Sequence, residues 1–205
     1  MEKIQQKYNS LIDIPSDINE HLPTLYNYAC ECETIFETGV RGVISTWAFV
    51  NGLLNNNLPR KKILLNDINS CDIDELTSFT KDFDGLEIQW EWKNNLELEF
   101  KESFDLTFID TWHIYGQLKR ELEKFSKITN KYIIMHDTTI DEIDGETIRN
   151  NWNAEIQSAQ FGFPVDEILK GLGPAIDEFL EEHPEWVLHE KFTNNNGLTI
   201  LKKLI

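Results

Sequence analysis

Short apolar runs alternate with helical patterns along most of the chain. Apolar and polar residues alternate in one of these runs, and the others are mostly continuous, as in strands that are buried on both faces. The runs predict five strands, at 34–37, 62–67, 86–92, 104–110 and 132–135. Apolar residues recur at helical spacing within 43–54 and 115–125, which predicts helices between the strands.

The N-terminal part of the chain is predicted to be helical. Residues 1–32 form a helical lead-in, in which Ser16 or Asp17 follows Pro15 and is placed to cap a helix. Residues 72–82 predict a further helix, acidic in composition.

The C-terminal part has a different pattern. Residues 174–182 predict an acidic amphipathic helix, and Pro174 fits the first turn of such a helix. The apolar runs 186–188 and 198–201 flank Asn196 and Gly197, a pair typical of reversing turns. The chain is therefore expected to end in two antiparallel strands.

Strands that alternate with helices are typical of a parallel sheet covered by helices on both faces. The expected fold is α/β: a Rossmann-like, doubly wound, mostly parallel sheet of seven strands with an antiparallel C-terminal pair. The prediction is a single domain over 1–205, with 1–32 as the lead-in and 33–205 as the core.

The net charge limits the classes of partner that the protein can bind, and the cysteines indicate the redox state of its compartment. Asp and Glu total 36 against 19 Lys and Arg, a formal net charge of −17, which argues against nucleic acid and anionic membranes as partners. The three cysteines are few and odd in number, which favours reduced thiols. With no apolar run of membrane-spanning length and no signal-peptide core, a cytoplasmic protein is expected.

Acidic residues follow the predicted strands. In doubly wound sheets, ligands bind beyond the carboxyl ends of the strands. Asp67 ends the second strand and could accept hydrogen bonds from a ribose diol, although a turn aspartate is an equally good interpretation. Asp110 and His113 follow the fourth strand, and a histidine there can take a proton near neutral pH. Asp137 follows the fifth strand; with Asp110 it would suit a hard divalent ion such as Mg²⁺.

The first strand ends in a turn with two glycines. Gly39 allows a tight turn and Gly42 a close approach by a helix or a ligand. The turn lacks the full glycine pattern of dinucleotide-binding proteins and the lysine of a phosphate-binding loop. At the third strand, one of Trp90 and Trp92 could stack on a flat base and the other should face the core, although packing in the core or at the edge is the better interpretation of either one alone.

Together these segments resemble a class I S-adenosylmethionine-dependent methyltransferase. The resemblance rests on IFETGVRGVIST, NDIN, FDLTFIDTWHIYGQLKREL and YIIMHDT, and extends from about residue 33 to the C-terminus. GPAIDEFLEEHPEW is similar to a late helix of the sugar O-methyltransferases of the macrocin and cephalosporin hydroxylase type. Sugar methyltransferase domains of large DNA viruses look similar too.

The resemblance implies a role for each matched position. The methionine and ribose part of the cofactor would be lined by Glu37, Thr38, Gly39, Gly42 and Ser45. Asp67 would hold the ribose hydroxyls, and Trp92 would border the adenine. Asp110 would lie near the cofactor amine or a metal ion, and His113 would be the catalytic base. Metal-dependent relatives have an acidic pair after the fifth strand, whereas this chain has His136 and Asp137 there, which weakens the metal assignment.

The predicted function is methyl transfer from S-adenosylmethionine to a hydroxyl of a sugar or glycan. A phenolic acceptor, a nicotinamide-dependent oxidoreductase and a non-catalytic binding domain remain as alternatives. A homodimer or a place in a larger multidomain protein is also open, and residues 140–170 have no predicted role.

Overall fold

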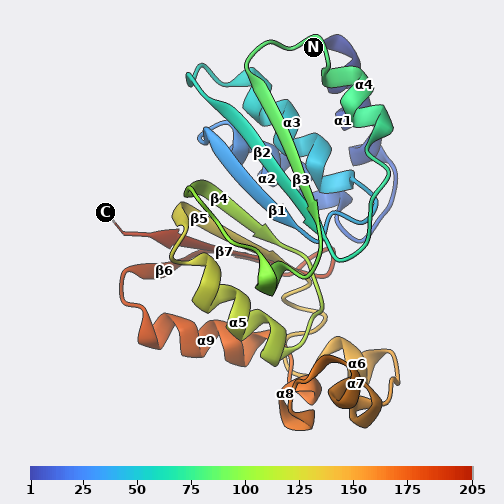
Figure 1. Cartoon of the computed structure of the whole chain (residues 1–205), viewed down its shortest axis with the longest axis vertical. Helices are drawn as coiled ribbons and strands as arrows, with labels where there is room; N and C mark the ends of the chain where they lie inside the picture. Colours follow the sequence, from blue (N-terminus) through green and yellow to red (C-terminus); the bar gives the residue numbers. More distant parts are fainter. Residues whose placement is uncertain (205) are drawn as a thin grey trace. The chain divides into compact units, whose positions relative to one another are not determined.

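The computed structural model describes residues 1–204, and the chain divides into two compact units, 1–109 and 110–205. The strands form one seven-stranded sheet in the order β3-β2-β1-β4-β5-β7-β6 (Figure 1). This order confirms the predicted fold class: a mostly parallel α/β sheet that ends in an antiparallel pair. The single domain expected over 1–205 stays a prediction.

The first unit holds four strands. β1 (Thr34–Thr38) pairs in parallel with β2 (Lys61–Asp67) and with β4 (Phe104–Ile109), and β2 pairs in parallel with β3 (Leu86–Trp92). Every residue of β1 is buried, whereas β3 lies at the edge and none of its residues is buried. The centre of the sheet is therefore the driest part of this unit, as its continuous apolar sequence predicts.

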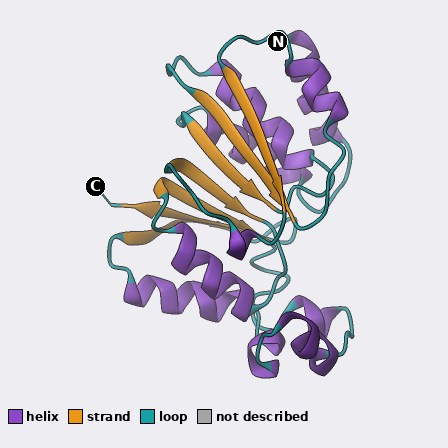
Figure 2. Ribbon diagram, viewed as in Figure 1, coloured by secondary structure: helices purple, strands orange, loops and turns teal. Residues whose placement is uncertain are grey.

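Four helices complete the first unit (Figure 2): α1 (Glu2–Asp13), α2 (Leu22–Ala29), α3 (Ile44–Asn55) and α4 (Asp74–Thr80). Short 3₁₀ turns at Asn19–His21 and Asn95–Glu97 join neighbouring elements. The helical lead-in is confirmed, and the Ser16 hydroxyl accepts a hydrogen bond from the backbone N–H of Asn19 at 3.0 Å. The N-cap position of this turn is Ile18, which makes no side-chain cap bond, so Ser16 holds the chain just before the turn and is not the cap that its position after Pro15 suggested.

The second unit holds the other three strands. β5 (Thr129–His136) and β6 (Trp186–Phe192) both pair antiparallel with β7 (Leu198–Lys203). Asn195, Asn196 and Gly197 all have positive φ in the turn between β6 and β7, where asparagine and glycine are the best tolerated residues. The predicted turn is therefore confirmed.

Five helices belong to the described part of this unit: α5 (Tyr115–Phe125), α6 (Glu146–Arg149), α7 (Ala154–Phe161), α8 (Val165–Leu169) and α9 (Leu172–Glu182). α5 and α9 lie side by side, while α6, α7 and α8 gather away from the strands of their unit (Figure 1). None of the helices in 1–204 is long and apolar enough to cross a membrane.

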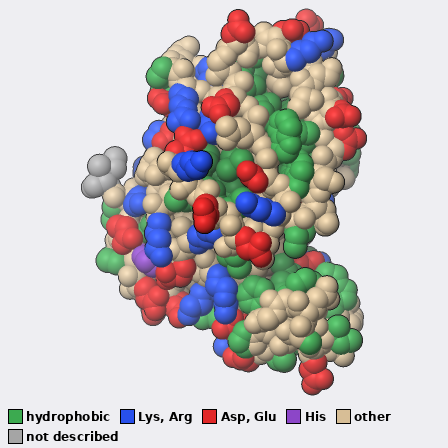
Figure 3. Space-filling model, in the orientation of Figure 1, with side chains coloured by type: hydrophobic (Ala, Val, Ile, Leu, Met, Phe, Trp, Pro, Cys, Tyr) green, Lys and Arg blue, Asp and Glu red, His purple; other side chains and the backbone are tan. Residues whose placement is uncertain are grey.

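The segment carrying α6, α7 and α8 leaves and rejoins the unit at one place. The backbone N–H of Gly171 donates to the carbonyl of Ile143 at 2.7 Å, and that of Leu172 donates to the carbonyl of Asp141 at 2.8 Å. Its surface carries exposed apolar side chains (Figure 3): Ile143, Ile148, Trp152, Ile156, Phe161 and Leu169. Such a gathering of apolar side chains is uncommon on a surface that contacts only water.

Candidate active site

The turn after β1 is held by backbone contacts within the first unit. Gly39 has φ +91°, which an L side chain rarely adopts, and its N–H donates to the Asn66 carbonyl at 2.8 Å. Arg41 and Val43 also have positive φ, so the chain turns sharply between β1 and α3. The glycine at position 39 is thus required by the turn.

Buried polar side chains fix the carboxyl ends of β1 and β2. The Thr38 hydroxyl donates to Asn66 Oδ1 at 2.8 Å and accepts from Asn95 Nδ2 at 3.0 Å. Ser45, in the first turn of α3, donates to Glu37 Oε1 at 2.5 Å. Glu37, Thr38 and Ser45 are all buried, so these predicted cofactor residues form a rigid polar floor.

Asp67 ties the turn to the end of β2. One carboxylate oxygen accepts from the Arg41 N–H at 2.9 Å, and the other accepts from the Asn69 N–H at 3.1 Å. Both oxygens therefore serve the turn, but each still has a lone pair for a further donor. The two interpretations of Asp67, turn residue and ribose ligand, are compatible.

The two tryptophans of β3 share one face, because residues two apart in a strand point to the same side. Trp90 is 49% exposed, and Trp92 is half-buried at the end of the strand. The expectation that one of them faces the core was wrong.

Gly42 lies in the turn between β1 and α3 and has open space around it. A Cβ added at this position would meet no atom closer than 3.8 Å. Neighbouring protein atoms therefore do not require a glycine at position 42, and the space beside it is available to a ligand.

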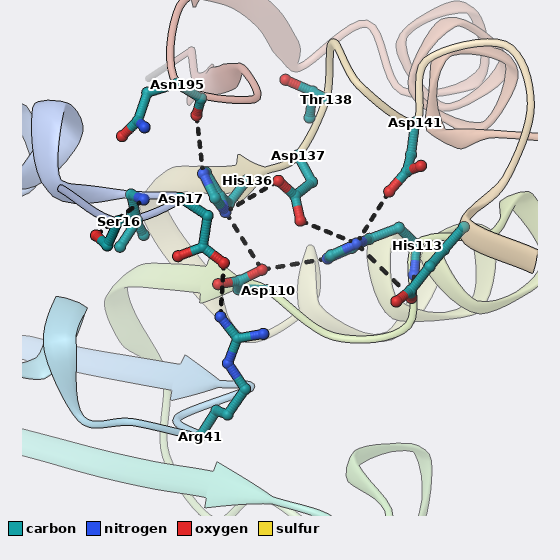
Figure 4. Close-up of polar contacts among 12 residues, drawn as sticks. Ser16, Asp17, Arg41, Asp110, His113, His136, Asp137, Thr138, Asp141 and Asn195 are labelled. Carbon is teal, nitrogen blue, oxygen red and sulfur yellow. Dashed lines mark hydrogen bonds and ion pairs between the residues drawn. The ribbon is translucent and has the colours of Figure 1, made fainter. Parts of the chain in front are cut away.

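In the second unit, His113 lies between carboxylates (Figure 4). Its Nε2 is 3.2 Å from Asp110 Oδ1, while its Nδ1 is 3.0 Å from Asp137 Oδ2 and 3.2 Å from Asp141 Oδ2. The prediction placed Asp110, His113 and Asp137 at neighbouring strand ends, and the structure brings these three together. A histidine stands between the two carboxylates that were expected to face each other directly.

His136, the last residue of β5, belongs to the same cluster. Its Nε2 lies 3.2 Å from the Asn195 carbonyl, and its Nδ1 lies 3.4 Å from Asp110 Oδ1. The ring is fully buried, and its two nitrogens link Asp110 to the turn before β7.

Three residues without a predicted role, Asp141, Glu146 and Arg149, complete the cluster. Arg149 binds Asp141 through two parallel hydrogen bonds of 2.7 and 2.8 Å. Glu146 accepts from the His113 N–H at 3.4 Å, and its own N–H donates to the His113 carbonyl at 2.9 Å. The signal was the spacing of Asp137 and Asp141, which a hydrogen-bonded turn brings together; the Asp141 N–H donates to the Asp137 carbonyl at 3.1 Å.

Opposite charges control protonation in this cluster. Burial opposes the charge on His113, but hydrogen bonds to Asp110 and Asp141 outweigh it and raise its pKa to about 10. Burial likewise opposes ionisation of Asp110, but His113 and His136 lower its pKa well below the ordinary range. Burial raises the pKa of Asp137. His113 is therefore an imidazolium at neutral pH in this arrangement.

A pH dependence of stability follows from the raised pKa of His113. Its protonated form is favoured by folding, so the stabilisation is fully present below the ordinary pKa of 6.5 and is lost as pH rises through about 10. We expect the difference in Tm between the wild type and His113→Gln to be large at about pH 6 and to shrink steadily toward about pH 10. Thermal unfolding at several pH values measures it, and a difference that grows with pH would contradict the assignment.

Three members of the cluster could hold a metal ion. Asp110, His113 and Asp137 each offer a ligand atom, and these atoms lie within 4.8 Å of one another. Asp137 is 6% exposed, and its buried Oδ1 accepts no hydrogen bond of good geometry. His136 Nδ1 lies 3.5 Å from this oxygen, too far for a good hydrogen bond, so a cation could bind there and the residues present fit the metal that the resemblance implies.

The sequence matches no protein-family model, and it matches no curated protein either. Solved structures do match the fold. An O-methyltransferase from Bacillus cereus, in complex with S-adenosylhomocysteine, is 16% identical, with a TM-score of 0.60 over 98% of this chain and 89% of its own.

Two further structures agree. The S-adenosylhomocysteine complex of the N-methyltransferase NodS from Bradyrhizobium japonicum WM9 is 12% identical, with a TM-score of 0.57 over 98% of both chains. The methyltransferase PaMTH1 from Podospora anserina, also bound to S-adenosylhomocysteine, is 15% identical, with a TM-score of 0.58 over 98% of this chain and 88% of its own. The chain has the class I methyltransferase fold. In this fold the predicted site residues all lie at or just after the carboxyl ends of β1 to β5, where doubly wound sheets bind ligands.

Proposed function

We propose that this protein is an S-adenosylmethionine-dependent O-methyltransferase that acts on a hydroxyl of a small molecule. The observation that carries the proposal is the methyltransferase fold together with the Asp110–His113–Asp137 cluster at its strand ends. All three compared structures hold S-adenosylhomocysteine, the product that remains when S-adenosylmethionine has given up its methyl group. The same fold without ionisable side chains at these positions would support only a binding domain.

The cofactor side of the site is assigned to the first unit. Glu37, Thr38 and Ser45 form the polar floor, Gly39 makes the turn, and Gly42 leaves space beside the backbone for a ligand. Asp67 would accept the ribose hydroxyls with its remaining lone pairs, and Trp92 would border the adenine. S-adenosylmethionine is cationic at sulfur, so an acidic surrounding favours it over the neutral product.

The chemistry side is assigned to the cluster in the second unit. Methyl transfer requires an acceptor oxygen held about 3 Å from the methyl carbon, in line with the breaking S–C bond. The hydroxyl must lose its proton, and His113 is the proposed base. Because its imidazole is protonated in this arrangement, His113 can act as the base only after it has lost a proton, and Asp137, whose Oδ2 is 3.0 Å from Nδ1, is the nearest carboxylate that could accept it. The neutral ring can then take the proton from the hydroxyl.

The acceptor class is proposed on two grounds. The resemblance of GPAIDEFLEEHPEW to sugar O-methyltransferases favours a carbohydrate. The exposed apolar side chains of the segment 143–169 favour the second candidate, a phenolic molecule with a flat apolar body. Trp112 does not offer a free platform for either, because it packs on Phe161 and Phe163 with ring centroids 5.2 and 5.6 Å away.

Calorimetric titration of S-adenosylmethionine and S-adenosylhomocysteine tests the class. We expect binding of both to the folded protein, followed by methyl transfer to sugar or phenolic hydroxyls in an assay with radiolabelled methyl donor. If neither ligand binds a protein shown to be folded by circular dichroism, the proposal is wrong and the fold serves another purpose.

Asp67→Ala tests the ribose assignment. Hydrogen bonds to a charged group contribute about 1.5–3 kcal/mol each, so we expect Kd for S-adenosylhomocysteine to rise about 10–100-fold. Asp67→Asn, which keeps an oxygen for the turn, should show part of this loss with unchanged Tm. The exposed Asp82 offers a control, since Asp82→Ala should bind normally. An unchanged Kd in Asp67→Ala would remove this residue from the cofactor site.

A further inference from the structure

The helix α7 is held at both ends but is not packed into its unit. The Asn153 side chain caps its start, with Oδ1 accepting from the backbone N–H groups of Glu155 and Ile156 at 2.9 and 3.0 Å, and Gly162 ends it with φ +79°. Within the described residues, α7 is the only α-helix in which no residue is buried. Helices this short gain most of their stability from a packed face. The surface of α7 is therefore available to pack against a partner.

Large apolar side chains lie on and beside this helix. Ile156 is 64% exposed, and Trp152 and Phe161, just before its start and at its end, are each 48% exposed. The six exposed apolar side chains of the segment 143–169 together present roughly 600 Å² of apolar surface, at roughly half of a large side chain each. A standard protein interface buries roughly 800 Å² of each partner. The area fits contact with another protein chain, whereas a small molecule would cover only a part of it.

We propose that residues 150–162, here called the α7 surface, dock against the same surface of a second copy of this chain. The net charge of −17 makes two copies repel one another over most of their surfaces. Charged residues make up 27% of the chain, whereas Glu155 is the only one among the thirteen residues of the α7 surface. A basic partner would be attracted to the acidic parts of the chain and not to this one. The α7 surface is therefore the place where two copies can meet with few like-charge contacts.

The polar side chains of the α7 surface are suited to contact with themselves. In a twofold dimer the same patch of both copies meets, so a side chain near the axis faces its own counterpart. Asn150, Asn151 and Gln160 are exposed, and an amide carries both donors and an acceptor, so two such side chains can bond to each other. Glu155 is the exception, since its counterpart would carry the same charge. The composition thus favours a second copy as the occupant, with Glu155 as the residue that weakens the contact.

Analytical ultracentrifugation of the full chain, over a range of protein concentrations and at low and high salt, tests the dimer. We expect a reversible equilibrium between monomer and dimer with a micromolar Kd. Raising the NaCl concentration should tighten the dimer, because the screening length falls from about 10 Å at 0.1 M to about 3 Å at 1 M and the repulsion between the net charges falls with it. The contact itself has few charges to be screened.

Three variants locate the contact. Ile156→Glu should weaken the dimer by at least about 30-fold, because it places a charge in an apolar contact. Position 156 is the third residue of α7 after the Asn153 cap, where glutamate suits a helix, so this variant should keep its fold. Leu188→Glu is the matched control, since Leu188 is 51% exposed on β6, and it should leave Kd unchanged. Glu155→Gln should tighten the dimer by about 2–5-fold, because it removes a like-charge contact.

Three results would overturn the proposal: a wild type that is monomeric at every concentration, a dimer that weakens as salt rises, or a dimer that is lost in Leu188→Glu but not in Ile156→Glu. Circular dichroism and Tm of each variant separate lost association from lost folding. A monomeric protein in which Ile156→Glu lowers methyl transfer would assign the α7 surface to the acceptor instead. The dimer does not depend on methyl transfer, so a protein that associates but binds no cofactor would keep this inference and reject the proposed function.

Discussion

His113→Gln is expected to lower kcat for methyl transfer by about 10²–10⁴-fold, the usual contribution of a positioned proton acceptor. Kd for S-adenosylhomocysteine should change little, because the residues assigned to the cofactor floor are bonded to one another and not to His113. The measurements are kcat with the best acceptor from the screen and calorimetric binding of S-adenosylhomocysteine.

A matched variant shows whether the loss of turnover is specific to His113 or follows from replacing any histidine. His189 lies on β6 and is exposed, so His189→Gln should keep full turnover. If His113→Gln loses cofactor binding and turnover in equal proportion, His113 is not a specific catalytic group. His113→Ala is a harsher test, because it leaves the surrounding carboxylates facing a cavity and is expected to lower Tm as well.

Gly171→Ala is expected to destabilise the second unit strongly. A Cβ at this position would lie 2.3 Å from the Asp141 carbonyl oxygen and 2.7 Å from the Glu142 carbonyl carbon, both of them backbone atoms. Backbone cannot swing aside like a flexible side chain, so we expect a loss of about 3 kcal/mol or more. For a chain of this size that corresponds to a fall in Tm of about 6–12 °C, measured by thermal unfolding.

Gly42→Ala is the control for this substitution, since a Cβ there would meet nothing closer than 3.8 Å and stability should change little. The crowding at Gly171 also predicts that Gly171→Ala disturbs the proposed catalytic cluster. Asp141 must move to admit the new methyl group, and its carboxylate lies 3.2 Å from His113. A Gly171→Ala protein as stable as the wild type would show that the two backbones can separate freely.

The sheet could be predicted from the sequence because its signals are local. Five apolar runs and the Asn196-Gly197 turn lie within short windows, and strands followed by helices leave few topologies open. The strand-end residues Asp110, His113 and Asp137 could be grouped for the same reason, since parallel strands bring their carboxyl ends to one edge. Boundaries moved by a few residues: β5 begins at Thr129 rather than at 132.

The other residues of the cluster could not be predicted, because no local sequence pattern indicates the contacts that they make. Arg149 reaches back to Asp141, and Glu146 contacts His113 across 33 positions of the chain. The protonation of His113 could not be inferred without knowing that carboxylates face both of its nitrogens. The prediction that Trp90 and Trp92 face opposite ways was wrong for a different reason, since strand alternation alone places them on the same face.

Backbone hydrogen bonds join Ile143 to Gly171 and Asp141 to Leu172, and they limit which parts of the sequence can vary during evolution. Because the chain between them departs and returns at neighbouring points, its length and composition can vary without shifting the register of any strand. The sheet and its strand-end residues would then be inherited intact while the inserted helices diverge. Related chains would be expected to differ most between positions 150 and 162, because Glu146 and Arg149 contact the cluster, Phe163 and Ile168 are buried, and α7 between them has no buried residue.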